Sequence, residues 1–199
     1  MTRKGYPRVR IIEGKQLKDI KVYRPIPFNK EVTKDDEIGE GVSVLYIPID
    51  PNGENLVDFA IIRSKGKVDL REEIPKDPKK PIKAKNGMKV KKIGVASGLT
   101  FGEIININAT VYVKYPDFER KVKFVDQIKT TKMAEEGDSG SFLYTLNNEP
   151  IGVLFSISRK FTYYNKLTNV CRLLNIPGIP SEFRETINKL CQGAPREGV

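Results

Sequence analysis

The sequence predicts an all-β fold of the barrel class that ends in a helix, and three observations lead to this prediction. Apolar runs are short and rich in β-branched residues, turn signals separate them, and helical periodicity is confined to the C-terminal end. Thirteen prolines and 16 glycines divide the 199 residues into short elements. A hydrophobic content of 39% is enough for the core of one domain, or of two small barrels packed together.

The first quarter of the chain contains short strand-like pieces, then a β-rich run over residues 40–49. Residues 50–53, with the letters Asp-Pro-Asn-Gly, predict a tight turn. The apolar run Leu56–Ile62 is predicted to be a strand with a single carboxylate inside it, Asp58. Because a buried, unpaired carboxylate is costly, Asp58 needs a partner or a role. The alternative is that Asp58 caps a turn at the edge of the strand.

Residues 65–87 are rich in lysine and proline and form the best candidate linker. The chain carries a net charge of +10, and part of it is concentrated in Lys76, Lys79, Lys80, Lys83, Lys85, Lys89, Lys91 and Lys92. Such a run could contact phosphates, or it could be a solvated hairpin or interdomain loop. No aromatic residues alternate with these lysines to stack on bases, so we do not expect nucleic acid to be a partner.

The second half continues with β patterns. Residues 89–94 alternate, residues 96–99 predict a turn, and Gly102–Tyr115 predicts a long β ribbon. A strand is predicted over Val122–Ile128, followed by a hairpin over residues 142–155 whose turn lies at residues 147–150. No strand is predicted between this hairpin and the first helix.

Two helices are predicted at the end of the chain. Apolar residues recur at helical spacing from Leu167 to Leu174. A second helix is predicted from about Ser181, a suitable N-cap, to a point before Gly193. Residues 181–199 are therefore expected to form a C-terminal helical tail.

The two cysteines, Cys171 and Cys191, are too few for a disulfide framework and are predicted to be reduced, partly buried thiols. The chain has no histidine, and no group of residues has the spacing of a zinc site, so we expect no metal and no cofactor. No apolar run approaches the ~20 residues that cross a bilayer, and no apolar segment follows the basic start. We therefore expect a soluble, cytoplasmic protein that does not contact a membrane. Its oligomeric state is not indicated.

Residues Gly137-Asp138-Ser139-Gly140-Ser141 are the stretch most suggestive of chemistry. This pattern presents a serine as a nucleophile: the N–H groups of Gly137 and Ser139 would stabilise an oxyanion, and Gly140 would permit tight packing behind the serine. The alternative is an ordinary turn, since glycine, aspartate and serine are all common in turns.

Several segments, in order along residues 36–180, resemble bacterial trypsin-like serine peptidases of the chymotrypsin fold. The branch that they resemble is the one related to plant NARROW LEAF-type proteases. The similar segments are residues 38–49, 55–61, 94–102, 126–128, 137–141, 151–156 and 167–174. The resemblance implies a chymotrypsin-like double β-barrel. Residues 1–75 would form an incomplete first barrel carrying Asp58, and residues 76–180 a second barrel carrying Ser139.

The resemblance also implies roles for individual residues. Ser139 maps to the nucleophile, Asp58 to the carboxylate that orients the base, and the amides of Gly137 and Ser139 to the oxyanion hole. Met133 would lie at the bottom of the specificity pocket, which implies a preference for apolar side chains. One wall of this pocket would be formed by Phe155, Ser156 and Ile157. The implied substrate is a peptide or protein.

The chain departs from the family because the histidine that takes the serine's proton is missing. The 57 residues before Asp58 contain neither a histidine nor the segment that carries it, so the first barrel is expected to be incomplete. Three interpretations stay open: a serine-protease product whose histidine is encoded elsewhere, an inactive homologue that binds peptides or proteins, and an unrelated β protein. Many lysines are present, but no sequence feature selects one as a substitute base.

Overall fold

The computed structural model describes the second half of the chain almost continuously and the first half in pieces. The described residues are 10–12, 21–23, 31, 33–34, 37–40, 44–46, 49–62, 80–174 and 181–192. The boundary expected between residues 75 and 76, most of the predicted linker, and Lys76 and Lys79 lie outside these residues.

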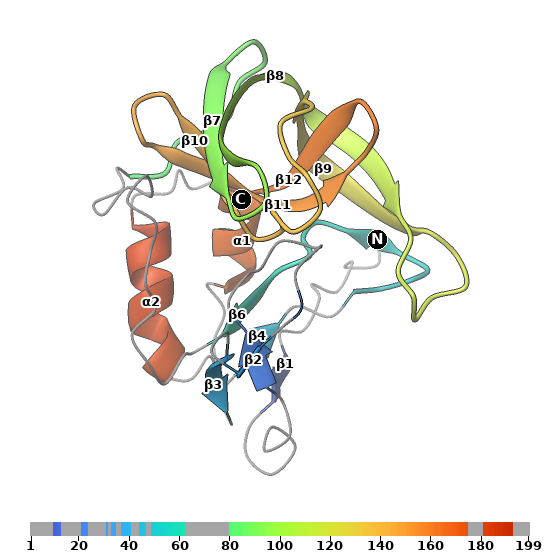
Figure 1. Ribbon diagram of the computed structural model, residues 1–199, viewed down its shortest axis with the longest axis vertical. Coiled ribbons are helices and arrows are strands. Elements are labelled where there is room, and N and C mark those ends of the chain that lie inside the picture. The colour runs from blue at the N-terminus through green and yellow to red at the C-terminus, as the bar shows by residue number, and fades with distance from the viewer. Residues whose placement is uncertain are drawn as a thin grey trace, which may run out of the picture.

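Six antiparallel strands form a closed ring, seen from green to orange in Figure 1. Around the ring they are β7 (Lys89–Gly94), β8 (Gly98–Val113), β9 (Val122–Thr131), β12 (Phe161–Lys166), β11 (Pro150–Ile157) and β10 (Phe142–Thr145). Pairing of β9 with β12 and of β10 with β7 completes the ring. The predicted strands and hairpin in this half are confirmed. Strand β12 was not predicted, although its letters Phe-Thr-Tyr-Tyr favour a strand.

The ring encloses its own apolar core. Val90, Ile104, Ile128, Leu143 and Tyr164 are almost completely buried and pack in one cluster. One strand after another contributes side chains at alternate positions, as expected where one face of a strand points inward. This core holds the strands that flank the predicted nucleophile loop.

The earlier strands are shorter, and within the described residues they do not close into a second ring. A three-stranded sheet contains β1 (Arg10–Ile12), β4 (Val44–Tyr46) and β6 (Ala60–Ile62). Strand β2 (Lys21–Tyr23) pairs with β3 (Glu37–Glu40), and β5 (Glu54–Asn55) runs parallel to β9 at the edge of the ring. This mostly β architecture matches the predicted fold class.

The predicted strand over Leu56–Ile62 is only partly right. Only Ala60–Ile62 is strand, and Asp58 lies in the irregular segment before it. The side chain of Asn165 replaces the missing strand pairing: it accepts a hydrogen bond from the Asp58 N–H at 3.1 Å and donates one to the Asp58 carbonyl at 2.8 Å. The apolar pattern indicated burial correctly for Val57, whereas its neighbours are half-buried or exposed. A side chain rather than a neighbouring strand satisfies the Asp58 backbone.

Both predicted helices are present, as α1 (Leu167–Leu174) and α2 (Ser181–Cys191). They share a second apolar cluster that includes Val57, Leu167, Leu174 and Ile187, so the helices also cover the segment that carries Asp58. Among the described residues, no helix combines the length and apolarity needed to cross a membrane.

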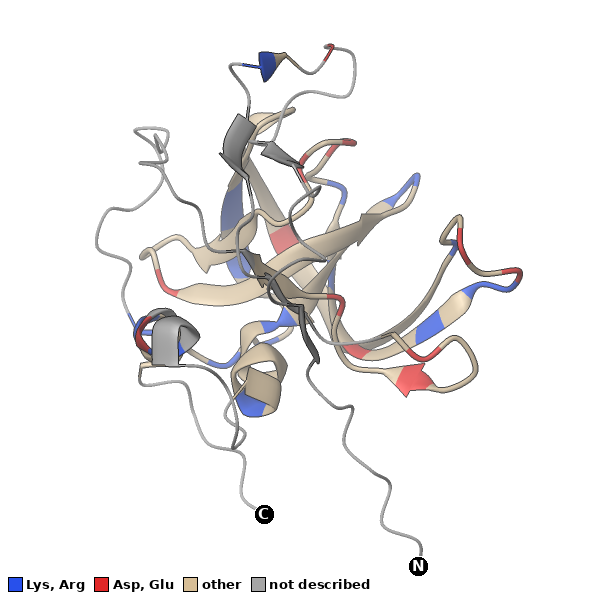
Figure 2. Cartoon of the chain, turned by 90° about the horizontal axis from the view of Figure 1, so that it is seen from below, with Lys and Arg blue, Asp and Glu red and all other residues tan. Residues whose placement is uncertain are grey.

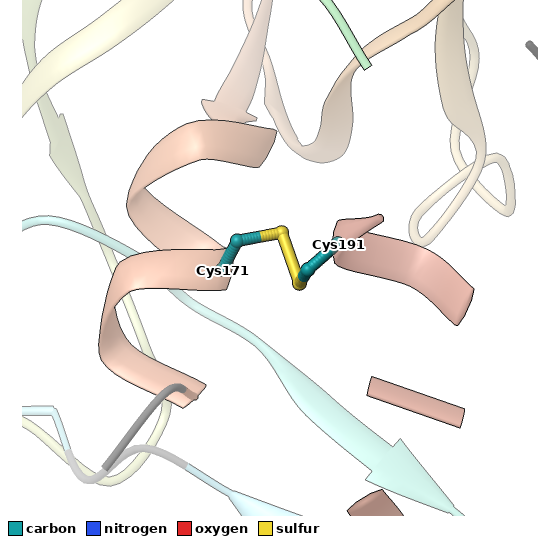
Figure 3. Close-up of a disulfide and its surroundings, with 2 residues drawn as sticks. All are labelled: Cys171 and Cys191. Atoms are coloured by element: carbon teal, nitrogen blue, oxygen red, sulfur yellow. A yellow bond between two sulfur atoms is a disulfide. The ribbon is translucent and has the colours of Figure 1, made fainter. Parts of the chain in front are cut away.

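The prediction of two reduced thiols is wrong, because Cys171 and Cys191 form a disulfide between α1 and α2 (Figure 3). Their Cα atoms lie 5.5 Å apart, within the range that a disulfide bridges. The bond was missed because two cysteines 20 residues apart show no framework in sequence. Their proximity arises only when α2 folds back onto α1.

Basic and acidic residues are interspersed over several elements of the described chain (Figure 2). In the predicted lysine run, Lys80, Lys83 and Lys85 are exposed, and Lys89 forms a surface ion pair with Glu103. Lys92 is different: its side chain is fully buried. The run is therefore neither a uniform solvated surface nor a continuous basic stripe.

Candidate active site

The predicted nucleophile lies in the turn that connects β9 to β10. Strand β11 holds this turn from behind, since the Gly140 N–H donates to the Leu154 carbonyl at 2.8 Å and the Leu154 N–H donates to the Ser141 carbonyl at 2.9 Å. Ser139 itself is exposed, and within the described part of the chain its hydroxyl makes no hydrogen bond. The hydroxyl is therefore accessible to a ligand.

The backbone of the turn leaves two donors unused. The Asp138 N–H donates to the Glu135 carbonyl at 3.1 Å, whereas the N–H groups of Gly137 and Ser139, on either side of it, find no acceptor among the described residues. Gly137 has φ 100°, a conformation that other residues rarely adopt. Two unused donors beside an exposed hydroxyl are what an oxyanion hole requires.

The expected reason for Gly140 needs correction. A Cβ atom on Gly140 would meet no atom within 4 Å, so tight packing does not require glycine here. Its φ of 85° does, because a side chain is strained in this region.

Asp138 anchors the turn from inside the protein. Its carboxylate accepts hydrogen bonds from Lys92 Nζ at 2.7 Å, from Ser97 Oγ at 2.6 Å, and from the N–H groups of Ala96, Ser97 and Glu135. Lys92 also contacts the Ser97 hydroxyl. Burial by itself raises the pKa of Asp138, but the bonds from Lys92, Ser97, Glu135 and Ala96 lower it to about 2. The carboxylate is therefore ionised at neutral pH and fixes the orientation of the residue between the two free donors.

Gly94 permits this approach. A Cβ atom there would lie 2.1 Å from Asp138 Oδ1 and 2.9 Å from Lys92 Nζ. Only glycine leaves room for the carboxylate beside the β7–β8 turn, so this turn and the serine turn, which are distant in sequence, are joined at this point.

Lys92 is a site residue that the sequence analysis missed. It was grouped with exposed lysines because lysine is almost never fully buried without a partner. Its position in the alternating strand did contain a signal, since Lys92 shares a strand face with Val90, which is also fully buried.

Asp58, which was predicted to orient the catalytic base, is half-buried beside the ring. Its Oδ2 accepts a hydrogen bond of 2.5 Å from the Tyr115 hydroxyl. Burial raises the pKa of Asp58, and the bond from Tyr115 offsets part of that rise. Tyr115 is a second residue that the sequence analysis missed, because 57 residues separate it from Asp58.

Asp58 and Ser139 are connected indirectly, through residues on the neighbouring strands β12 and β11. Asn165 of β12, which binds the Asp58 backbone, is paired with Val153 of β11, and the next residue, Leu154, binds the serine turn. Within the described residues, no hydrogen bond or ion pair joins the Asp58 carboxylate to Ser139.

The residues predicted to line the specificity pocket lie in two environments. Met133 is buried in the core of the ring, and its sulfur faces Gly102. Phe155, Ser156 and Ile157 are half-buried at the end of β11, and the Phe155 ring packs on Phe124 with the ring centroids 5.0 Å apart. In the described part of the chain, no three acidic or thiol side chains gather as a metal site would require.

No protein-family model and no curated protein sequence matches this chain, but solved structures do. A serine protease described as specific for glutamic acid, with a histidine triad in substrate binding, is 20% identical; the match covers 87% of each chain with a TM-score of 0.54. Alpha-lytic protease homolog N4 is 13% identical over 87% of this chain and 86% of its own, with a TM-score of 0.52. Nocardiopsis protease is 20% identical over 66% of this chain and 71% of its own, with a TM-score of 0.50.

The chain has the fold of chymotrypsin-like serine proteases. At these identities the likeness shows the fold alone, and the similar structures are bacterial enzymes. The predicted all-β, chymotrypsin-like fold class is thereby confirmed, with one closed ring among the described residues, whereas the branch related to NARROW LEAF-type proteases stays a prediction. Function has to be argued from the site itself.

Proposed function

We propose that this chain is a homologue of the trypsin-like serine endopeptidases, of the NARROW LEAF-related branch, which binds polypeptide at the Ser139 turn. The observation that carries the proposal is the pair of N–H donors at Gly137 and Ser139, which no described residue accepts, next to the exposed Ser139 hydroxyl, which makes no hydrogen bond to these residues either. The buried Lys92–Asp138 ion pair keeps these groups in place without a ligand. The substrate would lie along the end of β11, with an apolar side chain directed to Met133.

In this proposal Ser139 Oγ attacks the substrate carbonyl, and the two N–H groups stabilise the negative charge that develops on its oxygen. The C–N bond then breaks, which leaves the acyl group on Ser139 and releases the amine once it has received a proton. The hydroxyl proton must go to a base, and these 199 residues contain no histidine. Removing the histidine of a hydrolase that has the same kind of triad on an unrelated fold costs about 10⁶-fold in turnover. We therefore expect this chain by itself to become acylated slowly, although the two N–H donors are unused among the described residues.

The test is labelling of Ser139 by a fluorophosphonate, with and without added imidazole. We expect slow labelling that imidazole accelerates, because a free base then replaces the missing one, and none in Ser139→Ala. Labelling elsewhere, or the same slow rate for wild type and Ser139→Ala, would refute the assignment of Ser139. Rapid labelling without imidazole would refute the expected slow acylation.

A non-catalytic, peptide-binding role is the second candidate, and the Asp58–Tyr115 hydrogen bond favours it. The carboxylate that would orient a histidine is already bound by a hydroxyl that is no base at neutral pH. This role predicts that Ser139→Ala binds peptides from an apolar-residue library as tightly as wild type does. Binding that is lost with the Ser139 hydroxyl would contradict it.

A further inference from the structure

Asp58 and Tyr115 form a contact that the proposed acyl transfer does not use. The Tyr115 hydroxyl donates to Asp58 Oδ2 at 2.5 Å, whereas Asp58 Oδ1 has no hydrogen-bond partner among the described residues. A carboxylate accepts strong, short hydrogen bonds from hydroxyl groups. The bond therefore fixes the end of the Tyr115 side chain, just beyond the last residue of β8.

Three aromatic rings connect this bond to the end of β11. The Tyr115 ring lies 6.2 Å from that of Phe124, and Phe124 lies 5.0 Å from Phe155, both pairs tilted. These centroid distances fall in the range where aromatic rings attract one another. Phe124 is fully buried, so it has little freedom to move independently of either neighbour.

The ring of Tyr115 is held on its other side by Phe118, edge-on at a centroid distance of 6.0 Å. Lys114 in turn donates to the carbonyls of Phe118 and Glu119, which fastens the turn between β8 and β9. Tyr115 is thus oriented by a hydrogen-bonded turn, a carboxylate and a buried ring. A displacement of its ring would be passed to Phe124 rather than absorbed by solvent.

We propose that Asp58 and Tyr115 are positioning residues that set the place of the Phe155 ring through Phe124, and thereby the recognition of the substrate side chain that lies against Phe155. Only its last step, the recognition of a substrate side chain, rests on the proposed function; the positioning of Phe155 does not. It gives Asp58 a role that needs no histidine, and it makes Tyr115 a determinant of which polypeptides bind. An apolar or aromatic residue is the side chain that such a wall recognises.

The structural step is tested by fluorine NMR of protein labelled with 4-fluorophenylalanine at its nine phenylalanines. The Phe155 resonance is assigned by its loss in Phe155→Leu. We expect this resonance to shift or broaden in Tyr115→Phe and in Asp58→Asn. It should stay unchanged in Tyr112→Phe, which removes an exposed hydroxyl from β8, three residues before Tyr115. A Phe155 resonance that is equally unchanged in all three variants would overturn the proposal.

The recognition step compares two reagents on Ser139. One is a small fluorophosphonate, and the other is a peptidyl phosphonate diphenyl ester with phenylalanine at the reacting position. In Tyr115→Phe we expect the peptidyl reagent to lose about threefold to tenfold in rate relative to the small one, the size of coupling seen through packed networks. An unchanged ratio would overturn the role in recognition. If neither reagent labels wild type, the proposed function fails, and the NMR result alone decides the positioning.

Discussion

At the scale of single residues, the buried ion pair between Lys92 and Asp138 distinguishes this site most sharply from an ordinary turn. Both side chains are inaccessible to solvent, and the carboxylate accepts five hydrogen bonds that come from three segments of the chain. Such a pair adds little net stability compared with apolar side chains, but removing one partner leaves a buried charge uncompensated. The pair therefore specifies one conformation of the serine turn.

Lys92→Met should lower the free energy of unfolding by about 3–5 kcal/mol, because Asp138 loses its buried cation. The matched control is Lys89→Met on the same strand, which breaks an exposed ion pair and should cost less than about 1 kcal/mol. Urea unfolding of both variants measures the difference. Equal costs would contradict the structural role of Lys92, and Lys92→Met combined with Asp138→Asn should recover part of the loss.

Low pH should lower the free energy of unfolding, because it protonates the Asp138 carboxylate. The pKa of Asp138 is lowered from 3.8 to about 2 in the folded protein. A lowered pKa stabilises the folded state above the unfolded value, and this contribution of about 2 kcal/mol is lost as pH falls from about 4 through about 2. The difference in unfolding free energy between wild type and Asp138→Asn, measured from pH 5 to pH 2, should therefore shrink over that range. A constant difference would contradict the lowered pKa.

The sequence indicates candidate site residues best where these residues are neighbours in the chain. The unused N–H groups of Gly137 and Ser139 lie in one turn of four residues with the hydroxyl, so the sequence alone could place them together, while their role as oxyanion donors stays a prediction. Lys92 and Tyr115 could not, since their partners Asp138 and Asp58 lie 46 and 57 residues away and only the folded sheet brings them together. A single sequence shows which residue types are present, but not which of them meet.

At the scale of elements, the strands bounded by clear turn signals were predictable, whereas β12 and the segment before β6 were not. Strand β7 alternates only at its start, and the β10–β11 hairpin is predictable as two apolar runs on either side of a turn. Residues 56–59 are apolar enough for a strand. The Asn165 side chain, however, forms the two hydrogen bonds with the Asp58 backbone that a neighbouring strand would otherwise form. A tertiary contact thus overrides the local preference of these residues for a strand.

The disulfide between α1 and α2 should make the stability of the protein depend on redox conditions. The Cys171–Cys191 bond closes a loop with a sequence separation of 20, so reducing it should lower the unfolding free energy by about 3 kcal/mol. Urea unfolding with and without reductant measures this loss, and Cys171→Ala with Cys191→Ala should match the reduced form. A thiol reagent should find no free cysteine before reduction. Two reactive thiols in the untreated protein would contradict the bond.

At the scale of the molecule, the segment with Asp58 is fastened to the ring by a few specific contacts. Gln127 Nε2 donates to the Leu56 carbonyl at 2.8 Å, Lys123 forms an ion pair with Glu54, and Val57 packs in the apolar cluster under the helices. The class of fold was predictable because the ring's strands are contiguous in sequence. The attachment of residues 54–58 to the ring was not predictable, because it depends on side chains of β9 and β12 that contact this segment.

Asn165→Ala tests whether this attachment is local or global. The fully buried Asn165 side chain satisfies both backbone groups of Asp58, so its removal should cost about 1–3 kcal/mol for each group left unpaired. Because the ring has its own core, amide hydrogen exchange should accelerate in residues 54–62 and change little in β7, β8 and β10. Asn147→Ala, in the exposed turn before β11, should leave both regions unaffected. Faster exchange throughout the ring would instead show that the Asp58 segment and the ring unfold as one cooperative unit.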